Sequence, residues 1–221
     1  MTSTLEIHVA GRSLRCRSDR SLAVPATGLL LVADLHLDKA EHLRALHVPA
    51  PFASLEADLS RLGRAVAEER PEALIVLGDL YHAKGGASAP VTLGAFRRWR
   101  RAHRQLHIVL VEGNHDRYAG PPAPDLDIDA AGSDLFVDDA AGALVLTHEP
   151  RAERGAYVLA GHVHSGVRVG TTSDRLQVPA FRFGRETGVL PAFSSLASAA
   201  PWPPLASEQI VAITDGTLVS L

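Results

Sequence analysis

Side chains of metal-binding type follow five separate apolar runs of the sequence. The five stretches are "VADLHLD", "LGDLYH", "EGNHD", "LTHEP" and "GHVHSG". Their candidate ligands are Asp34, His36, Asp79, Asn114, His148, His162 and His164. Oxygen and imidazole ligands without thiolates suit divalent ions such as manganese, iron or zinc. Seven candidates exceed the needs of one open catalytic site. They favour two ions about 3.5 to 4 Å apart, which a carboxylate such as Asp79 can bridge.

The spacing within these stretches predicts how the ligands are presented. In an extended segment residues i and i+2 point to the same side, so "DLH" and "HVH" can each direct two side chains to one centre. Gly78, Gly113 and Gly161 stand beside three of the clusters, where we expect sharp turns that let the backbone approach the ions or a phosphate. A lone histidine at a strand end is usually a satisfied polar residue. Six of the eleven histidines fall in these clusters, however, and buried charged groups are normally paired or bound to metal.

The apolar runs before the clusters have the pattern of buried strands separated by helices. "TGLLLVADLHL", "EALIVLGDLYH" and "HIVLVEGNHD" each end in charge. Between them, "SLEADLSRLGRAVAEER" and "APVTLGAFRRWRRAHRQL" have helical periodicity, and Pro71 ends the first. This alternation predicts a mixed sheet with crossover connections, and such sheets place their sites at strand ends.

The remaining segments complete one domain over residues 1–221. Residues 5–18 alternate apolar and polar residues, which predicts a hairpin at a sheet edge. Residues 119–134 are rich in proline and acid and predict a surface loop. The motif core covers 29–165, and short strands joined by turns are expected over 166–221. Within that part, the low-complexity residues 194–207 predict a mobile surface segment.

Composition limits the classes of function. With 46% hydrophobic residues, 21% charged residues and a formal charge of -3, the chain has the composition of a soluble globular protein and no overall attraction for nucleic acid. Any polyanion site must therefore be local. The single cysteine, Cys16, excludes an internal disulfide and fits a reducing, cytoplasmic setting. The longest apolar run, "GLLLVA", is far shorter than the about 20 residues that cross a bilayer, so membrane spanning is not expected.

The order Asp-x-His, Gly-Asp, Gly-Asn-His-Asp, His and Gly-His-x-His over residues 29–165 resembles the calcineurin-like metallophosphoesterase superfamily. The stretches "LLVADLHLDKAEHLRALHVPAP", "LIVLGDLYH", "GNHDR", "THEP" and "GHVHSG" are similar to the bacterial ligase-associated DNA damage response endonuclease family, PdeM. The N-terminal hairpin and "VPAFRFG…LPAF" extend this likeness over nearly the whole chain. The resemblance implies an α/β fold, a four-layer αββα sandwich with two mixed β-sheets. Asp38 is a departure, because we expect glycine there in that family.

The resemblance also implies roles for the site residues. One ion would be held by Asp34, His36, Asp79 and His164, and the other by Asp79, Asn114, His148 and His162. Manganese is the expected metal, with iron or zinc as alternatives. A water or hydroxide shared by the two ions would attack phosphorus. His115 would protonate the leaving oxygen, while Asp116 fixes the orientation of His115 and raises its basicity.

Residues around the motifs have open assignments. Asp38 adds a carboxylate near the metals, and His82 is either a hydrogen-bond donor near Asp79 or a strand cap. Arg117 either contacts a substrate phosphate or forms a surface salt bridge. His42 and His47 are expected to be surface or packing residues.

"AFRRWRRAHRQLH" is the main basic run. At helical spacing Phe96, Trp99, His103 and Leu106 share one face, and Arg97, Arg101 and Arg104 share another with Arg98 beside it. One interpretation is a solvated helix whose aromatic face lies in the core. The other is a stripe that binds DNA phosphates and weakens steeply with salt. Lys39, Arg44 and Lys84 are candidates to extend such a stripe.

Three functions are compatible with the sequence. The PdeM resemblance implies a manganese-dependent endonuclease or phosphodiesterase on single-stranded DNA in repair, associated with a DNA ligase, a helicase and an exonuclease. The alternative is a phosphatase or phosphodiesterase of small nucleotides or phosphoproteins, because one metal centre serves many substrates. A non-catalytic scaffold is the weakest reading, since a scaffold is expected to have lost ligands or His115. The sequence leaves the oligomeric state open.

Overall fold

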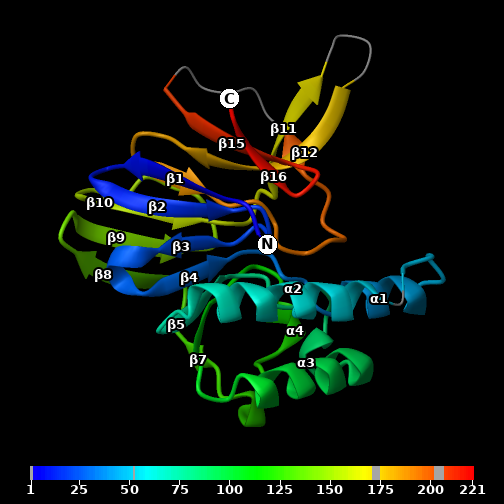
Figure 1. Cartoon of the computed structure of the whole chain (residues 1–221). Coiled ribbons are helices and arrows are strands. Elements are labelled where there is room, and N and C mark those ends of the chain that lie inside the picture. The colour runs from blue at the N-terminus through cyan, green and yellow to red at the C-terminus, as the bar shows by residue number, and fades with distance from the viewer. Residues whose placement is uncertain (1, 52, 171–174, 202–206) are drawn as a thin grey trace.

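Two mixed β-sheets pack against each other, and helices cover one of them. The computed structural model describes residues 2–51, 53–170, 175–201 and 207–221 (Figure 1). The first sheet has the order β1-β2-β3-β4-β5-β6-β7, and the second has β14-β11-β12-β13-β10-β9-β8 with β15 beside β12 and β16 beside β15. The predicted α/β sandwich of two mixed sheets is confirmed.

The bounds of the elements are as follows. The first sheet contains β1 (Thr4–Val9), β2 (Arg12–Arg17), β3 (Leu22–Val24), β4 (Leu29–Val32), β5 (Ala73–Leu77), β6 (His107–Val111) and β7 (Asp129–Ala130). The second contains β8 (Asp134–Asp139), β9 (Gly142–Thr147), β10 (Ala156–Ala160), β11 (Ser165–Gly170), β12 (Arg175–Phe183), β13 (Thr187–Val189), β14 (Ala200–Pro201), β15 (Gln209–Thr214) and β16 (Thr217–Ser220). The α-helices are α1 (Lys39–Ala45), α2 (Ser54–Glu69), α3 (Pro90–Ala102) and α4 (Asp116–Ala119), and the short 3-10 turns are η1 (Pro25–Thr27), η2 (Gly86–Ser88) and η3 (Pro124–Leu126).

The period-2 pattern of the central strands explains the layers. In β4, Leu30 and Val32 pack with the helices α2 and α3, whereas Leu31 packs into the core between the two sheets. β5 and β6 repeat this alternation, because successive side chains of a strand point to opposite faces. Strands that are buried on both faces read as continuous apolar runs, and β4, β5 and β6 are parallel to one another as expected for such strands.

The predicted helices and the N-terminal hairpin are confirmed. Leu55, Leu59 and Leu62 of α2 are buried against the first sheet. Pro90 occupies the first turn of α3, where the missing N–H of proline costs no hydrogen bond. β1 and β2 form an antiparallel hairpin at the edge of the first sheet, and the free thiol of Cys16 is buried in it.

Three parts differ from expectation. The described residues contain no α-helix after Ala119, so the helical layer expected over the second sheet is not seen in them. The loop over 119–134 contains η3 and β7, and Leu126 is fully buried, because α3 packs on it. Of the segment 194–207, residues 202–206 lie outside the described residues. Among its described residues, Ser194 is buried and Ala200–Pro201 pairs with β11, while the mobility of the segment stays a prediction.

In the described part of the chain, no helix has both the length and the apolar character that crossing a bilayer requires.

Candidate metal centre

The candidate ligands come together where five strands end, three parallel strands of the first sheet and two parallel strands of the second. Asp34 and His36 follow β4, Asp79 follows β5, and Asn114 follows β6. From the second sheet, His148 follows β9, while His162 and His164 follow β10. The two sheets thus present their carboxyl ends to the same place, which is where open α/β sheets carry their sites.

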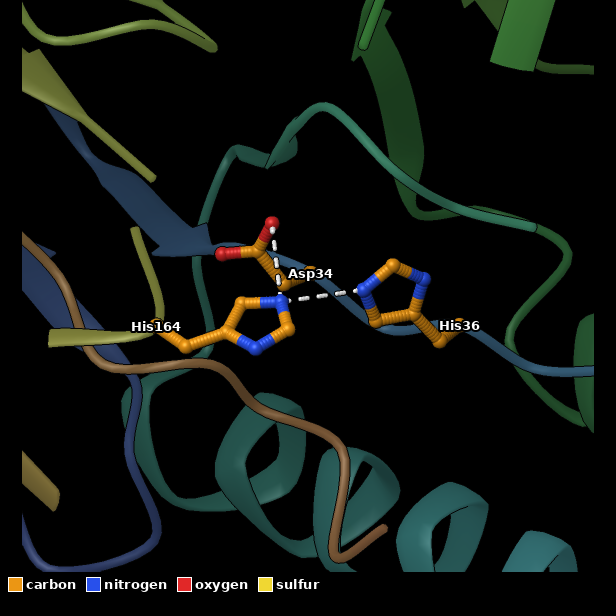
Figure 2. Close-up of side chains that lie close together, drawn as sticks. All are labelled: Asp34, His36 and His164. Carbon is orange, nitrogen blue, oxygen red and sulfur yellow. Dashed lines mark hydrogen bonds and ion pairs between the residues drawn. The ribbon is translucent and has the colours of Figure 1, made fainter. Parts of the chain in front are cut away.

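Asp34, His36 and His164 form one cluster (Figure 2). Their ligand atoms lie within 4.8 Å of one another. The Nε2 atoms of His36 and His164 are 3.1 Å apart, and the His164 Nε2 lies 3.9 Å from a carboxylate oxygen of Asp34. Asp34 and His36 are buried, so their converging atoms are shielded from solvent.

Asp79, His148 and His162 form a second cluster with the same limit of 4.8 Å between ligand atoms. The Nε2 of His148 lies 3.0 Å from Nδ1 of His162 and 3.0 Å from Oδ1 of Asn114. The structure therefore places the side-chain oxygen of Asn114 with this cluster, as the resemblance implied.

Asp79 lies between the two clusters. One of its carboxylate oxygens is 3.8 Å from Nε2 of His36, and the other is 3.4 Å from Nε2 of His148. Each oxygen therefore faces a different cluster, which is the arrangement that a bridging carboxylate needs. Ligation by these seven residues stays a prediction.

The donor set fits a pair of divalent cations. Among the described ion pairs neither Asp34 nor Asp79 has a lysine or arginine partner, although both are buried. Burial, with the neighbouring charge of Asp79, raises the pKa of Asp34 well above its usual range. Burial lowers the pKa of His36 to about 2, so its imidazole is neutral and able to bind a metal. Buried carboxylates beside neutral imidazoles are stabilised by a bound cation.

The backbone at the ligands corrects one expectation. Asp34, His36, Asp79, His162 and His164 all have positive φ, between 44° and 69°, so "DLH" and "HVH" are not extended. Instead each pair lies in the irregular segment after its strand, and the two histidines of "HVH" divide between the two clusters, as the resemblance implied. Left-handed residues other than glycine cost of order 1 to 3 kcal/mol each and gather at functional sites.

Two glycines permit this packing, and the sharp turn expected at Gly78 is confirmed by its positive φ. Gly78 has a φ of 75°, and a Cβ there would collide with the ring of His148. A Cβ on Gly113 would collide with Asp79. These glycines therefore make room for the neighbouring ligand side chains, while the approach of the backbone to ions or a phosphate stays a prediction.

His115 lies at the mouth of the centre. Its Nε2 is 4.0 Å from a carboxylate oxygen of Asp79, and its side chain is 35% exposed, in contrast to the buried His36 and His148. Its backbone N–H donates to Asp79 over 3.0 Å. The imidazole can thus reach both the centre and a molecule that enters from solvent.

Asp116 does not orient His115, which corrects the role that we expected. Nδ1 of His115 is 2.5 Å from the backbone carbonyl oxygen of His82. The Asp116 carboxylate instead accepts hydrogen bonds from the backbone N–H groups of Asp79 (2.8 Å), Tyr81 (3.2 Å) and Gly113 (2.9 Å). Burial raises the pKa of Asp116 to about 6. Asp116 therefore ties the loop after β5 to the loop after β6, because its carboxylate accepts N–H groups from both.

The structure also places the residues with open assignments. Asp38 is buried and accepts hydrogen bonds from the backbone of the loop after β5. The ring of His82 stacks on His115 and meets the edges of His36 and His42, and burial lowers the pKa of His82 to about 4. Arg117 lies 3.6 Å from Glu112 in an exposed ion pair, which favours the salt-bridge interpretation.

Lys39 lies close to the metal centre. The sequence suggested it only as a residue that could extend the arginine stripe considered for binding DNA phosphates. Burial lowers its pKa, and its charge acts on Asp34, His36 and His164. Within the described residues it forms no ion pair with a carboxylate. Its position three residues after His36 was the available signal. A half-buried ammonium beside the centre is suited to bind a phosphate oxygen.

Most arginines of α3 form hydrogen bonds or ion pairs with other residues of the protein. Phe96 and Trp99 are buried, as expected of the core-facing side. Arg97 forms a two-pronged pair with Asp125 at 2.6 and 2.7 Å, and Arg98 pairs with Glu56 at 2.6 Å. The exposed Arg101 and Arg104 line a surface cavity of about 300 Å³, to which Asp125 and Asp127 also contribute. The mixed charge of this face favours the solvated-helix interpretation.

Comparison with known proteins identifies the family. A model of the calcineurin-like phosphoesterase family matches residues 28–166. The structure of a nuclease, MPE, from Pseudomonas putida is 34% identical, with a TM-score of 0.86 over 99% of this chain and 100% of its own. YfcE, a phosphoesterase from E. coli, is 17% identical with a TM-score of 0.43, and covers 85% of this chain and 88% of its own. No curated protein sequence matches significantly. The chain belongs to the calcineurin-like phosphoesterase family, whose reaction is the hydrolysis of phosphoesters.

Proposed function

We propose that this protein is a two-metal phosphodiesterase that cuts single-stranded DNA, with manganese as its metal, in DNA repair. The observation that carries this proposal is the position of Asp79, whose two oxygens face two separate ligand clusters. The likeness to a bacterial nuclease over the full length of both chains supports a polynucleotide substrate. The buried, unpaired thiol of Cys16 fits a cytoplasmic protein.

The roles of the residues follow from the geometry. Two divalent ions bound here would polarise the phosphoryl oxygens and supply a nucleophile at neutral pH. Asn114 and the carboxylates and imidazoles of the two clusters hold these ions. Lys39 binds a phosphate oxygen of the substrate. In its doubly protonated form His115 gives the proton on Nε2 to the leaving oxygen and keeps the proton on Nδ1, because Nε2 lies 4.0 Å from Asp79 and the side chain is partly exposed.

The proposal extends to partners. A nuclease that acts on single strands leaves ends that must be trimmed and sealed. We therefore place this protein in functional association with a DNA ligase, a helicase and an exonuclease. Single-stranded DNA itself is the first partner to test, because every other association depends on it.

The test is cleavage of a labelled circular single-stranded DNA beside bis-4-nitrophenyl phosphate. Each is incubated with manganese, magnesium, zinc or a chelator, and Asn114→Ala serves as the blank. We expect the circle to be cut with manganese and spared by both the chelator and the blank. Hydrolysis of the small ester alone would contradict the DNA assignment and direct the search to small nucleotides and phosphoproteins.

A further inference from the structure

Asp38 precedes the first residue of α1, but its side chain binds another part of the chain. Aspartate before a first helical turn commonly caps that helix with its side chain. α1 begins at Lys39, yet the Asp38 side chain makes no capping hydrogen bond. Its carboxylate instead accepts the backbone N–H groups of His82 at 2.5 Å and Ala83 at 2.9 Å. Asp38 therefore holds a different segment, the loop that follows β5.

The loop is shaped around this carboxylate. A Cβ on Gly86 would collide with the Asp38 carboxylate, so the chain passes directly over it. The turn is closed by a hydrogen bond from the Gly86 N–H to the Ala83 carbonyl oxygen at 2.9 Å. Asp38 itself is 1% exposed. Because the carboxylate is enclosed, removing one of its oxygens leaves a backbone N–H of the loop without its partner.

The same loop holds His115. The carbonyl oxygen of His82 accepts the Nδ1–H of His115 at 2.5 Å. The two rings also stack, with 4.9 Å between centroids and 19° between planes. A carbonyl oxygen only accepts hydrogen bonds, so this contact requires the proton of the neutral imidazole to be on Nδ1. It leaves Nε2 directed to Asp79 and the centre, so a second proton taken up on Nε2 is the one that His115 can give to the leaving oxygen.

We propose that Asp38 is a positioning residue that acts on His115 through the backbone of His82. The Asp38 carboxylate fixes the peptide groups at His82 and Ala83, and the His82 carbonyl then fixes the tautomer and ring direction of His115. This inference rests on the proposed function in one respect, the transfer of a proton from His115 to the leaving oxygen.

Asp38→Asn tests the inference, because the amide keeps the size of the carboxylate but sets an NH₂ group against one backbone N–H. Glu41→Gln is the matched control. Glu41 lies on α1, three residues after Asp38, and also accepts backbone N–H groups, those of Val91 and Thr92, but these belong to the start of α3. The first readout is the ¹⁵N NMR signal of His115 in metal-free protein, assigned with His115→Ala.

We expect the wild type and Glu41→Gln to show the Nδ1–H tautomer and Asp38→Asn to show a mixture of tautomers. An unchanged His115 signal in Asp38→Asn would overturn the proposal. Gly86→Ala is a second variant that displaces the same carboxylate, and the same mixture is expected from it. It decides the question if Asp38→Asn does not fold.

The second readout is turnover, with manganese, of bis-4-nitrophenyl phosphate and of methyl phenyl phosphate, whose leaving groups are poorer. We expect Asp38→Asn to lower kcat on the poorer ester by about 10- to 100-fold, a range typical of groups that orient a functional side chain. The loss on the nitrophenyl ester should be smaller, with KM and the two ions per chain retained.

In a His115→Ala background, Asp38→Asn should cause no further loss. Equal losses on the two esters, or a full additional loss in that background, would contradict the proposal. Both esters are small, so a wild type that hydrolyses them without cutting DNA would refute the DNA assignment and still leave the Asp38 comparison decisive.

Discussion

The metal centre and the arginine face of α3 are both dense in charge, but they are built differently. At the centre, side chains from five strand ends converge, and the buried carboxylates Asp34 and Asp79 lack a lysine or arginine partner among the described ion pairs. On α3 the charges come from one helix, lie in solvent, and two of the arginines pair with Asp125 and Glu56.

The difference shows which kind of charge cluster indicates chemistry. Burying a charged group without a partner costs free energy of folding, so such groups are normally paired or bound to a metal ion. Exposed ion pairs are not desolvated, and they contribute little to the stability of the fold.

Asp79→Ala should have the largest effect. Loss of the carboxylate that faces both clusters should remove both ions and reduce phosphodiester hydrolysis to the level seen with a chelator. The readout is the metal content per chain, measured by inductively coupled plasma mass spectrometry. Asp125→Ala removes a carboxylate from the helix face and should keep both ions. An Asp79→Ala protein that still holds two ions would refute the bridging assignment.

His115→Ala should keep both metals and lose turnover according to the leaving group. Proton donation contributes about 10²- to 10⁴-fold, so we expect a loss of that order with methyl phenyl phosphate. A smaller loss is expected with bis-4-nitrophenyl phosphate, whose leaving group needs no proton. His107→Ala, an exposed histidine at the opposite end of β6, is the control. Equal losses on the two esters would count against the role of His115 as an acid.

Lys39→Ala tests the rim of the centre. A charge-assisted hydrogen bond to a phosphate is worth about 1.5 to 3 kcal/mol, which corresponds to at least about tenfold in affinity. We expect KM for DNA to rise by that factor while metal content is unchanged. Lys84→Ala removes an exposed lysine from the neighbouring loop and should have little effect. A KM that is the same in both variants would exclude Lys39 from substrate binding.

The double substitution Arg101→Gln with Arg104→Gln should have the smallest effect. Contacts with single-stranded DNA contribute a salt slope of about 0.7 per phosphate neutralised. We expect the slope of log kcat/KM for DNA against log salt to stay unchanged. A decrease of about 1.4, the amount for two phosphates, would show that the helix face binds DNA after all.

Much of the architecture was readable from local pattern. The apolar runs of β4, β5 and β6 and the leucine spacing of α2 predicted the covered sheet, because burial on both faces requires apolar residues at every position of a strand. The expectation of a helical layer over the second sheet had less support, and the described residues contain no α-helix after Ala119. It rested on the resemblance alone, since no helical periodicity supports it after residue 134.

The identity of the candidate ligands was likewise determined by the sequence alone. Carboxylate, amide and imidazole groups after successive strands have a restricted set of uses, and parallel strands bring their ends together. The spacing alone did not assign the two imidazoles of "HVH" to the two clusters, although the resemblance implied the division that the structure has. His162 and His164 are two residues apart, yet left-handed backbone conformations direct them to different clusters.

Only the tertiary structure decided which group forms the hydrogen bond that orients the His115 ring. The sequence places Asp116 next to His115, and adjacency made Asp116 the expected partner. In the fold Asp116 holds backbone N–H groups, while the His82 carbonyl, 33 residues away along the chain, takes the imidazole. Hydrogen bonds to backbone carry no signature in residue type, because every residue offers the same carbonyl. The sequence by itself therefore determined which side chains take part, and the packing of its loops determined which atoms they meet.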